Sequence, residues 1–263
     1  MSETLSQGGP RTLRIWRGKG EDGEFVDYTL QTEPGMVVLD AVLEIQRSQA
    51  PDLAVRWNCK AAKCGSCGCE INGHPKLACK TRLDHLPADR PITVEPMHTF
   101  PPIQDLVADV SWNYEVNKQI PPFEPRDDLP EGDYLIDQAD ADRMSEFRKC
   151  IECFLCQDVC HVLRDHRLYD KYYGPRFMVR LASLDMHPLD GLDRIDLTAD
   201  QAGIGYCNTT KCCTEVCPVG IHITDNAIIP LKERVVDARH DPLLKLLHRN
   251  NKRPGKRKPG ASA

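Results

Sequence analysis

The chain has 263 residues, of which 41% are hydrophobic and 28% charged, and its formal net charge is −5. These values are those of an ordinary globular protein with one large or two modest domains. No apolar run approaches the roughly 18 residues of a membrane-spanning helix, so we expect no membrane crossing by the chain itself. The first residues lack the layout of a signal or transit peptide, which favours a reducing compartment where disulfides are rare. The 13 cysteines therefore need another role, and metal ligation is the leading explanation.

The N-terminal region alternates strand and turn signals. Residues 12–16 and 25–30 are strand-like and flank a Gly-rich turn, which predicts a hairpin. Apolar residues then recur at helical spacing over 38–46, and residues 91–96 form a further short strand pattern. Two strands, a helix and later strands are typical of a β-grasp sheet.

The first group of cysteines has the plant-type [2Fe–2S] ferredoxin spacing. Cys59, Cys64 and Cys67 follow the pattern C-x4-C-x2-C, and Cys79 comes later in the chain. The small residues of the loop allow the backbone to wrap closely around inorganic sulfur. An Asn-Gly hairpin signal at 72–73 returns the chain, so that Cys79 comes back beside the loop. We predict that these four cysteines hold a [2Fe–2S] cluster.

Prolines concentrate between residues 97 and 133. We place the junction of two domains at residues 100–103 and interpret the later Pro-rich stretch as an extended surface strap. From residue 140 the apolar spacing becomes helical, and a helix starting at Pro175 is predicted because Pro suits the first helical position. A further helical pattern covers 221–236, with a kink or break at Pro230.

The remaining cysteines form one motif in two copies. The first copy is the bacterial ferredoxin run Cys150-x2-Cys153-x2-Cys156-x3-Cys160. The positions 57 residues later hold Cys207, Thr210, Cys213 and Cys217, followed by Pro218. The second copy is therefore the same run with Thr210 in place of its second cysteine.

This substitution predicts two different clusters. In the bacterial ferredoxin arrangement, the fourth cysteine of each run ligates the cluster of the other run. Four thiolates then complete a [4Fe–4S] cluster, and only three remain for the other. A cubane that lacks one thiolate tends to lose that iron, so we infer [3Fe–4S]. The ligands are Cys150, Cys153, Cys156 and Cys217 for the former and Cys160, Cys207 and Cys213 for the latter.

Two cysteines are surplus to these sets. Cys69 is interpreted as a packed thiol, with ligation as the alternative. Cys212 could supply a fourth thiolate, but consecutive side chains diverge by about 100° on a helix, so we expect it to point elsewhere. Zinc also binds four cysteines, yet zinc ribbons use two separated C-x2-C pairs rather than four cysteines within residues 150–160.

The last segment is basic. Residues 241–263 carry a net charge of +6, whereas residues 1–240 carry −11. This pattern is typical of a solvated, flexible tail, or of one attracted to anionic lipid or to an acidic partner surface. No groove-reading motif accompanies the charge, so we expect no nucleic-acid partner.

The order of these cysteine motifs resembles the iron–sulfur subunit of succinate dehydrogenase and fumarate reductase, respiratory complex II, of a bacterial type. The resemblance covers about residues 10–240. It implies an α+β chain with three segments: a β-grasp [2Fe–2S] domain over 1–102, an all-α bacterial-ferredoxin-like domain over 103–240 and the basic tail over 241–263. It also implies the same cluster ligands.

The resemblance further implies the function. A flavoprotein subunit with FAD would oxidise succinate, and electrons would pass through the [2Fe–2S], [4Fe–4S] and [3Fe–4S] clusters to membrane quinone. The chain would be a subunit of an oxidoreductase with no catalytic acid or base of its own. It would lie peripherally on the cytoplasmic face of the cell membrane, held by anchor subunits. The alternatives are the same path run in reverse by a quinol:fumarate reductase, and an adaptor of another flavin dehydrogenase.

The sequence departs from the family near the expected quinone site. Members often have Pro after the cysteine matching Cys160, a Trp a few residues later, and His after the cysteine matching Cys207. Here His161 and Asn208 hold the two flanking positions, and residues 161–170 contain no Trp. His161 and Asn208 are candidates for quinone contact, and both His161 and His166 are candidates for proton delivery or quinone contact. The alternative is a histidine on a helix surface or one that packs behind the ligands.

Overall fold

A computed structural model describes residues 8–129, 132, 134–241 and 256–257. The chain divides into two compact units, one of residues 1–110 with 151–159, and one of residues 111–150 with 160–263. The division into three segments expected from the sequence stays a prediction. Within the described ranges, none of the helices has both the length and the apolar character needed to span a bilayer.

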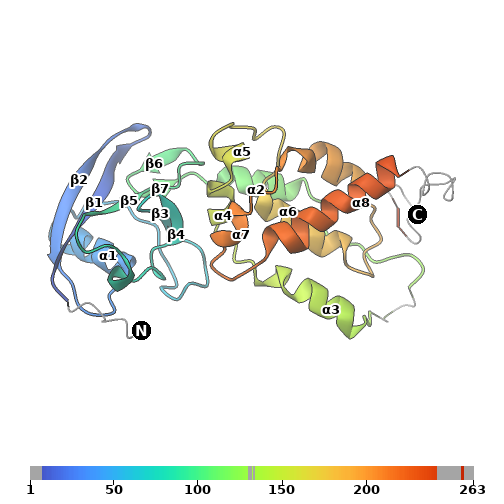
Figure 1. Ribbon diagram of the computed structural model, residues 1–263, viewed down its shortest axis with the longest axis horizontal. Coiled ribbons are helices and arrows are strands. Elements are labelled where there is room, and N and C mark those ends of the chain that lie inside the picture. The colour runs from blue at the N-terminus through green and yellow to red at the C-terminus, as the bar shows by residue number, and fades with distance from the viewer. Residues whose placement is uncertain (1–7, 130–131, 133, 242–255, 258–263) are drawn as a thin grey trace. The chain divides into compact units, whose positions relative to one another are not determined.

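A mixed sheet forms the framework of the first unit (Figure 1). The predicted hairpin is confirmed: β1 (Pro10–Lys19) pairs antiparallel with β2 (Asp22–Gln31) over its whole length. On its other side, β1 pairs in parallel with β5 (Ile92–Glu95). This central strand buries Leu13 and Ile15 completely, which explains its apolar alternation. The arrangement is that of a β-grasp sheet, as the sequence predicts.

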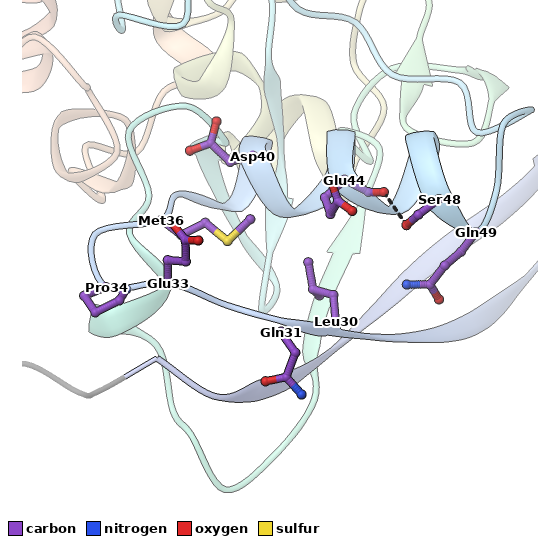
Figure 2. Close-up of a pocket in the computed structure, with 9 residues that line it drawn as sticks. All are labelled: Leu30, Gln31, Glu33, Pro34, Met36, Asp40, Glu44, Ser48 and Gln49. Carbon is purple, nitrogen blue, oxygen red and sulfur yellow. Dashed lines mark hydrogen bonds between the residues drawn. The ribbon is translucent and has the colours of Figure 1, made fainter.

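Helix α1 (Val38–Ser48) covers the sheet with its apolar face (Figure 1). It begins where the Asp40 carboxylate accepts a hydrogen bond from the Val37 N–H at 3.3 Å. Beside it, the end of β2 borders an open groove of about 560 Å³ (Figure 2). The groove is lined by carboxylates of Glu33, Asp40 and Glu44 but by none of the cysteines, so it is separate from the candidate cluster sites.

The remaining strands carry the chain past the first cysteine loop. Asn72 and Gly73, at φ +52° and +73°, join β3 (Gly68–Ile71) to β4 (His74–Leu77), which is the expected tight hairpin. The short helix η1 (Leu83–His85) follows. Strands β6 (Pro102–Gln104) and β7 (Val107–Ala108) extend the sheet beyond residue 102, because β6 pairs with β1.

Residues 151–159 complete the first unit with α4 (Leu155–Asp158). The Asp158 carboxylate accepts a hydrogen bond from the Thr99 N–H at 2.9 Å, and the Asp158 carbonyl accepts one from the Thr99 hydroxyl at 2.9 Å. The rings of Phe100 and Phe154 meet edge to face at 6.4 Å. The middle of the first cysteine run, with Cys153 and Cys156, is thereby anchored in the core of the sheet domain, although it lies far away in sequence.

The second unit is built from helices, as expected. The helices before the second cysteine copy are α2 (Ser111–Lys118), α3 (Gln138–Ser145), η2 (Phe147–Lys149), α5 (His161–Arg164) and α6 (Pro175–Asp185). Around and after the copy come η3 (Leu197–Gln201), η4 (Ile204–Tyr206), α7 (Cys212–Glu215), η5 (Ile223–Ile228) and α8 (Ile229–His240). The predicted start of α6 at Pro175 is confirmed. Pro230 lies in the first turn of α8, directly after the π-helical turn η5, so the expected break lies at this change of helix type.

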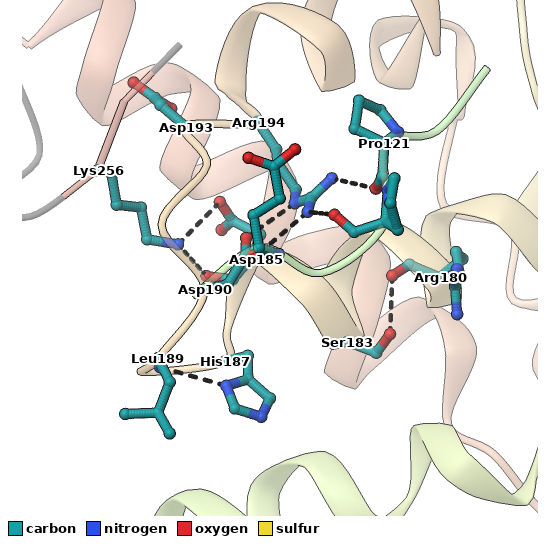
Figure 3. Close-up of polar contacts among 12 residues, drawn as sticks. Pro121, Arg180, Ser183, Asp185, His187, Leu189, Asp190, Asp193, Arg194 and Lys256 are labelled. Atoms are coloured by element: carbon teal, nitrogen blue, oxygen red, sulfur yellow. Dashed lines mark hydrogen bonds and ion pairs between the residues drawn. The ribbon is translucent and has the colours of Figure 1, made fainter. Parts of the chain in front are cut away.

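A buried ion pair fixes the Pro-rich strap in this unit (Figure 3). Arg194 and Asp190 are both fully buried, with Nε and Oδ2 2.9 Å apart. The same guanidinium donates to the carbonyls of Pro121 and Pro122, each at 2.7 Å. The strap is therefore held by a charged group whose hydrogen bonds are satisfied, as burial of a guanidinium requires.

Two residues of the basic C-terminal segment also contact acidic groups of this unit. The Arg257 guanidinium donates to the Glu124 carboxylate at 2.9 Å. The Arg257 N–H donates to the Gly191 carbonyl, and the Arg257 carbonyl accepts from the Asp193 N–H. Lys256 donates to the Asp185 carbonyl at 3.0 Å (Figure 3). These two residues bind within their own chain. The rest of the predicted flexible tail, residues 242–255 and 258–263, lies outside the described residues.

Candidate cluster-binding sites

The loop of residues 59–67 directs backbone N–H groups at the predicted ligand sulfurs. The Cys59 sulfur accepts from the N–H groups of Ala61 and Lys63, both at 3.3 Å. The sulfurs of Cys79, Cys67 and Cys64 accept from the N–H groups of Ala62, Cys79 and Cys59 at 3.3, 3.4 and 3.5 Å. All four predicted ligands thus receive hydrogen bonds of the kind that stabilise thiolates bound to iron.

This wrapping needs left-handed backbone conformations. Lys60 and Ala62 both have φ +55°, and Gly65 has φ +74°. A Cβ atom on Gly65 would lie 2.6 Å from the Cα atom of Cys153, a distance that real Cβ atoms do not reach. Gly65 therefore lets the loop of residues 59–67 contact the backbone of Cys153. Both belong to the same compact unit.

The thiols of the loop differ in acidity. A hydrogen bond from the Ser66 side chain, with backbone hydrogen bonds from Cys59 and Ser66, lowers the pKa of Cys64 to about 6 against a smaller opposing effect of burial. Burial raises the pKa of Cys67 to about 12. Iron binding must therefore displace a proton from Cys67, whereas Cys64 is already a thiolate at neutral pH.

Cys69 is a further thiol, within electrostatic reach of Cys67 and Cys79. It is on β3 and is almost completely buried, and that burial raises the pKa of its thiol. This environment is that of the packed thiol expected from the sequence.

The internal repeat extends to the backbone. Glu152 and Phe154 have φ +55° and +60°, and Thr209 and Lys211, 57 positions later, have φ +60° and +67°. The short helices correspond in the same way, η2 with η4 and α4 with α7. The second copy thus keeps the conformation of the first, with exposed Thr210 at the position of Cys153.

The cysteines of the two runs are divided between the units. Cys153 and Cys156 belong to the first unit, and Cys150 and Cys217 to the second. The Cys217 sulfur accepts a hydrogen bond from the Ile221 N–H at 3.3 Å, so this predicted ligand also has a backbone donor.

The helical unit holds the three cysteines predicted for the [3Fe–4S] cluster. Burial raises the pKa of Cys160 to about 12, although the N–H groups of Leu163 and Val162 donate to its sulfur. Burial likewise raises the pKa of Cys213 to about 11, and the Thr224 hydroxyl lies 3.5 Å from its sulfur. The third is Cys207, whose backbone carbonyl accepts a hydrogen bond from the Lys232 ammonium group.

The expectation that Cys212 points elsewhere is wrong, because its side chain lies beside Thr210, at the position of the missing ligand. Its sulfur lies 3.3 Å from the Thr210 hydroxyl oxygen. It is adjacent to Cys213 at the start of α7, and the thiol contributes to the raised pKa values of Cys213 and Cys160.

Tyr172 and Thr224 are polar groups near this site that the sequence did not reveal. Tyr172 is fully buried in the segment between α5 and α6. Burial, followed by the thiols of Cys207, Cys160 and Cys213, raises its pKa well above the usual value. No spacing rule connects either residue to the cysteines, so only the tertiary structure identifies them.

The candidate quinone residues flank two of these cysteines. His161 begins α5 directly after Cys160, and its ring lies edge to face with that of His166, with centroids 6.3 Å apart. Asn208 is exposed directly after Cys207. Both candidates therefore lie in the helical unit, each beside a predicted ligand.

The donor set fits iron–sulfur clusters rather than disulfides. All 13 cysteines are free thiols. In the part of the chain that the structure describes, no three His, Cys, Asp or Glu side chains close around a position for a single metal ion. The thiols instead lie in loops whose backbone N–H groups donate to sulfur. Such loops stabilise the negative charge of an iron–sulfur cluster and its thiolate ligands.

Comparisons with known proteins agree with this geometry. Residues 12–115 match the family described as "2Fe-2S iron-sulfur cluster binding domain", and residues 146–221 match the "4Fe-4S dicluster domain". The chain is 35% identical to the "Fumarate reductase iron-sulfur subunit" of Mycobacterium tuberculosis, covering 75% of this chain and 80% of that protein. It is 29% identical to the "Succinate dehydrogenase iron-sulfur subunit" of Bacillus subtilis, covering 75% and 81%.

A solved structure is also similar. The chain superimposes on one chain of the "Mycobacterium smegmatis Sdh1 complex in the apo form" with a TM-score of 0.87 and 56% identity. The match covers 90% of this chain and 99% of that one.

Proposed function

Since the chain belongs to the family of iron–sulfur subunits of succinate dehydrogenase and fumarate reductase, we propose that it conducts electrons between the FAD of a flavoprotein subunit and membrane quinone. It works as one subunit of an oxidoreductase whose dicarboxylate site lies on the flavoprotein. Its other partners are the membrane-anchor subunits. The observation that carries the proposal is the set of backbone N–H groups directed at all four sulfurs of the first loop.

The cysteines divide into three ligand sets. Bound clusters supply one-electron redox centres, which suit transfer from a two-electron flavin donor. The protein holds them and stabilises their negative charge with N–H groups from the loops and from helix starts. The proposed ligands are Cys59, Cys64, Cys67 and Cys79 for [2Fe–2S]; Cys150, Cys153, Cys156 and Cys217 for [4Fe–4S]; and Cys160, Cys207 and Cys213 for [3Fe–4S].

Further parts of the proposal concern the membrane side. We place the subunit on the cytoplasmic face of the cell membrane, held there by the anchor subunits. His161 and Asn208 are the proposed quinone contacts because each follows a proposed [3Fe–4S] ligand. Quinone reduction takes up protons, and histidine is a common proton carrier in proteins.

Low-temperature EPR on the complex purified from membranes tests the assignment. An oxidised sample should give a [3Fe–4S] signal, and a reduced sample a [2Fe–2S] signal. An intact [4Fe–4S] cluster at residues 207–217 would contradict the three-thiolate set. Failure to purify with a flavoprotein would contradict the subunit role.

The physiological direction depends on cluster and quinone potentials. Named relatives include both a fumarate reductase and a succinate dehydrogenase subunit. Comparing succinate oxidation with ubiquinone and menaquinone analogues, and fumarate reduction with the quinols, would identify the favoured direction and quinone type.

A further inference from the structure

Tyr172 places a hydroxyl group in a fully buried position. Its side chain has 0% exposure, and no group among the described residues has full hydrogen-bond geometry to its oxygen; the Cys207 side chain is a weak partner. A buried hydroxyl without a well-aligned partner is destabilising. In native proteins such a group usually has a partner, which can be an ordered water or a bound molecule.

The local backbone holds Tyr172 in this position. The Tyr173 N–H donates to the Ala202 carbonyl at 3.2 Å, and the Tyr172 N–H donates to the Leu168 carbonyl at 3.0 Å. Gly203 has φ +62°, and a Cβ atom there would lie 1.7 Å from the Lys171 carbonyl oxygen. The glycine therefore allows residues 171–173 to lie directly against the segment that leads to Cys207.

The ionisable groups that act on the hydroxyl belong to the three proposed [3Fe–4S] ligands. In order of effect they are Cys207, Cys160 and Cys213. A phenol is un-ionised at neutral pH, so it can donate its proton, and a thiolate or sulfide sulfur can accept a hydrogen bond. The Tyr172 hydroxyl, as donor, therefore lies near the sulfur atoms of the proposed [3Fe–4S] site, which can accept its hydrogen bond.

We propose that the Tyr172 hydroxyl donates a hydrogen bond to a sulfur of the [3Fe–4S] site and so raises its reduction potential. This inference rests on the ligand set of the proposed function. One-electron reduction adds negative charge to the site, so a hydrogen-bond donor stabilises the reduced form more than the oxidised form. Tyr172 thereby tunes the terminal acceptor of the chain without ligating iron.

The adjacent tyrosine provides a matched control. Tyr173 is also buried, but its hydroxyl donates to the Gln119 side-chain oxygen at 2.6 Å. Replacing either tyrosine with Phe removes a single oxygen. Only Tyr172→Phe should remove a donor to the cluster, whereas Tyr173→Phe should remove a hydrogen bond within the protein.

The test is an EPR-monitored redox titration of the purified complex. We expect Tyr172→Phe to change the one-electron equilibrium constant about tenfold toward the oxidised form, a fall of about 59 mV in the midpoint. Tyr173→Phe should leave the midpoint unchanged. Iron analysis and the size of the EPR signal would report cluster content separately, so partial loss of cluster would not be mistaken for a shift.

Deuterium exchange gives a second measurement. After exchange into D2O, pulsed EPR of the wild type should detect a deuteron coupled to the [3Fe–4S] signal that Tyr172→Phe lacks. An unchanged midpoint together with an unchanged deuteron coupling would overturn the hydrogen bond and leave the proposed function intact. Absence of a [3Fe–4S] signal from the wild type would overturn the ligand set and this inference with it.

Discussion

The Ser66 side chain gives Cys64 a thiolate character that buried Cys67 does not share. Because the pKa of Cys64 is lowered to about 6, its thiolate predominates above that pH and is lost below it. In iron-free protein, alkylation of Cys64 by iodoacetamide should therefore rise through pH 6 and be fast at pH 7. Ser66→Ala should raise the pKa and slow the reaction at pH 7 several-fold. Equal rates in both proteins, measured by mass spectrometry, would contradict this role of Ser66.

Alanine substitutions at two glycines distinguish the cost of a left-handed backbone conformation from the cost of steric crowding. Gly65 and Gly73 have nearly equal φ values of +74° and +73°, but only Gly65 has a neighbour, Cys153, in the space of a Cβ atom. Alanine costs about 1–2 kcal/mol in this conformation at either position. Gly65→Ala should also displace the loop and lower the [2Fe–2S] content, measured by EPR and iron analysis. Equal cluster content in Gly65→Ala and Gly73→Ala would show that the contact with Cys153 is unimportant.

At the scale of elements, the two cysteine copies share one backbone path and differ at Thr210. Thr210→Cys places a thiol where Cys153 lies in the first copy, so we expect a fourth iron and loss of the [3Fe–4S] EPR signal from oxidised samples. Cys212→Ser should keep that signal, because the proposed ligands of this cluster are Cys160, Cys207 and Cys213. Loss of the three-iron signal in Cys212→Ser would instead identify Cys212 as a ligand.

A carboxylate links the helical turns before Cys150 and after Cys217. Glu146 accepts hydrogen bonds from the His222 N–H at 2.7 Å, from His222 Nδ1 at 2.8 Å and from Asn226. Burial opposes its ionisation, but the hydrogen bonds from the His222 backbone and from the Asn226 and His222 side chains outweigh burial and lower the pKa of Glu146. Its stabilising effect is therefore present above the unfolded-state pKa of about 4.3 and is lost as pH falls through the lower folded-state value.

Glu146→Gln tests this link. We expect the variant to lose about 1 kcal/mol of unfolding free energy at pH 7, and the difference from wild type to shrink in acid. Thermal unfolding at several pH values would measure both effects. Glu215→Gln, an exposed change on α7, is the control. A deficit that grew as the pH fell would contradict the sign of the pKa shift.

At the scale of the whole molecule, the Arg194–Asp190 pair ties the Pro-rich strap to the helical unit. Asp190→Ala leaves a buried guanidinium without its counter-charge and should cost about 3–5 kcal/mol. The measurement is chemical or thermal unfolding of the purified chain, with proteolysis of the strap as a second readout. Asp170→Ala, which removes an exposed partner of Lys171, should have little effect. Similar stability of the two variants would mean that the strap is held by other contacts.

The sequence could predict what depends on local spacing. The ligand runs, the offset between the copies, the turn at 72–73 and the start of α6 at Pro175 all follow from a few neighbouring residues. It could not predict that Tyr172 reaches the cysteines, because that depends on the packing of separate segments. Arg194 and Asp190, four residues apart, look like an ordinary surface pair, yet both are buried.

The bonds between Thr99 and Asp158 have a consequence for biosynthesis. On the ribosome, residues 8–110 emerge before Asp158, which accepts hydrogen bonds from the N–H and hydroxyl of the buried Thr99. The sheet domain can complete its core only after residue 159 has been translated, so its maturation is delayed by about fifty codons beyond its last strand. The nascent chain therefore presents an incomplete ferredoxin fold to the cell's assembly machinery while the first cysteine loop is already available for iron.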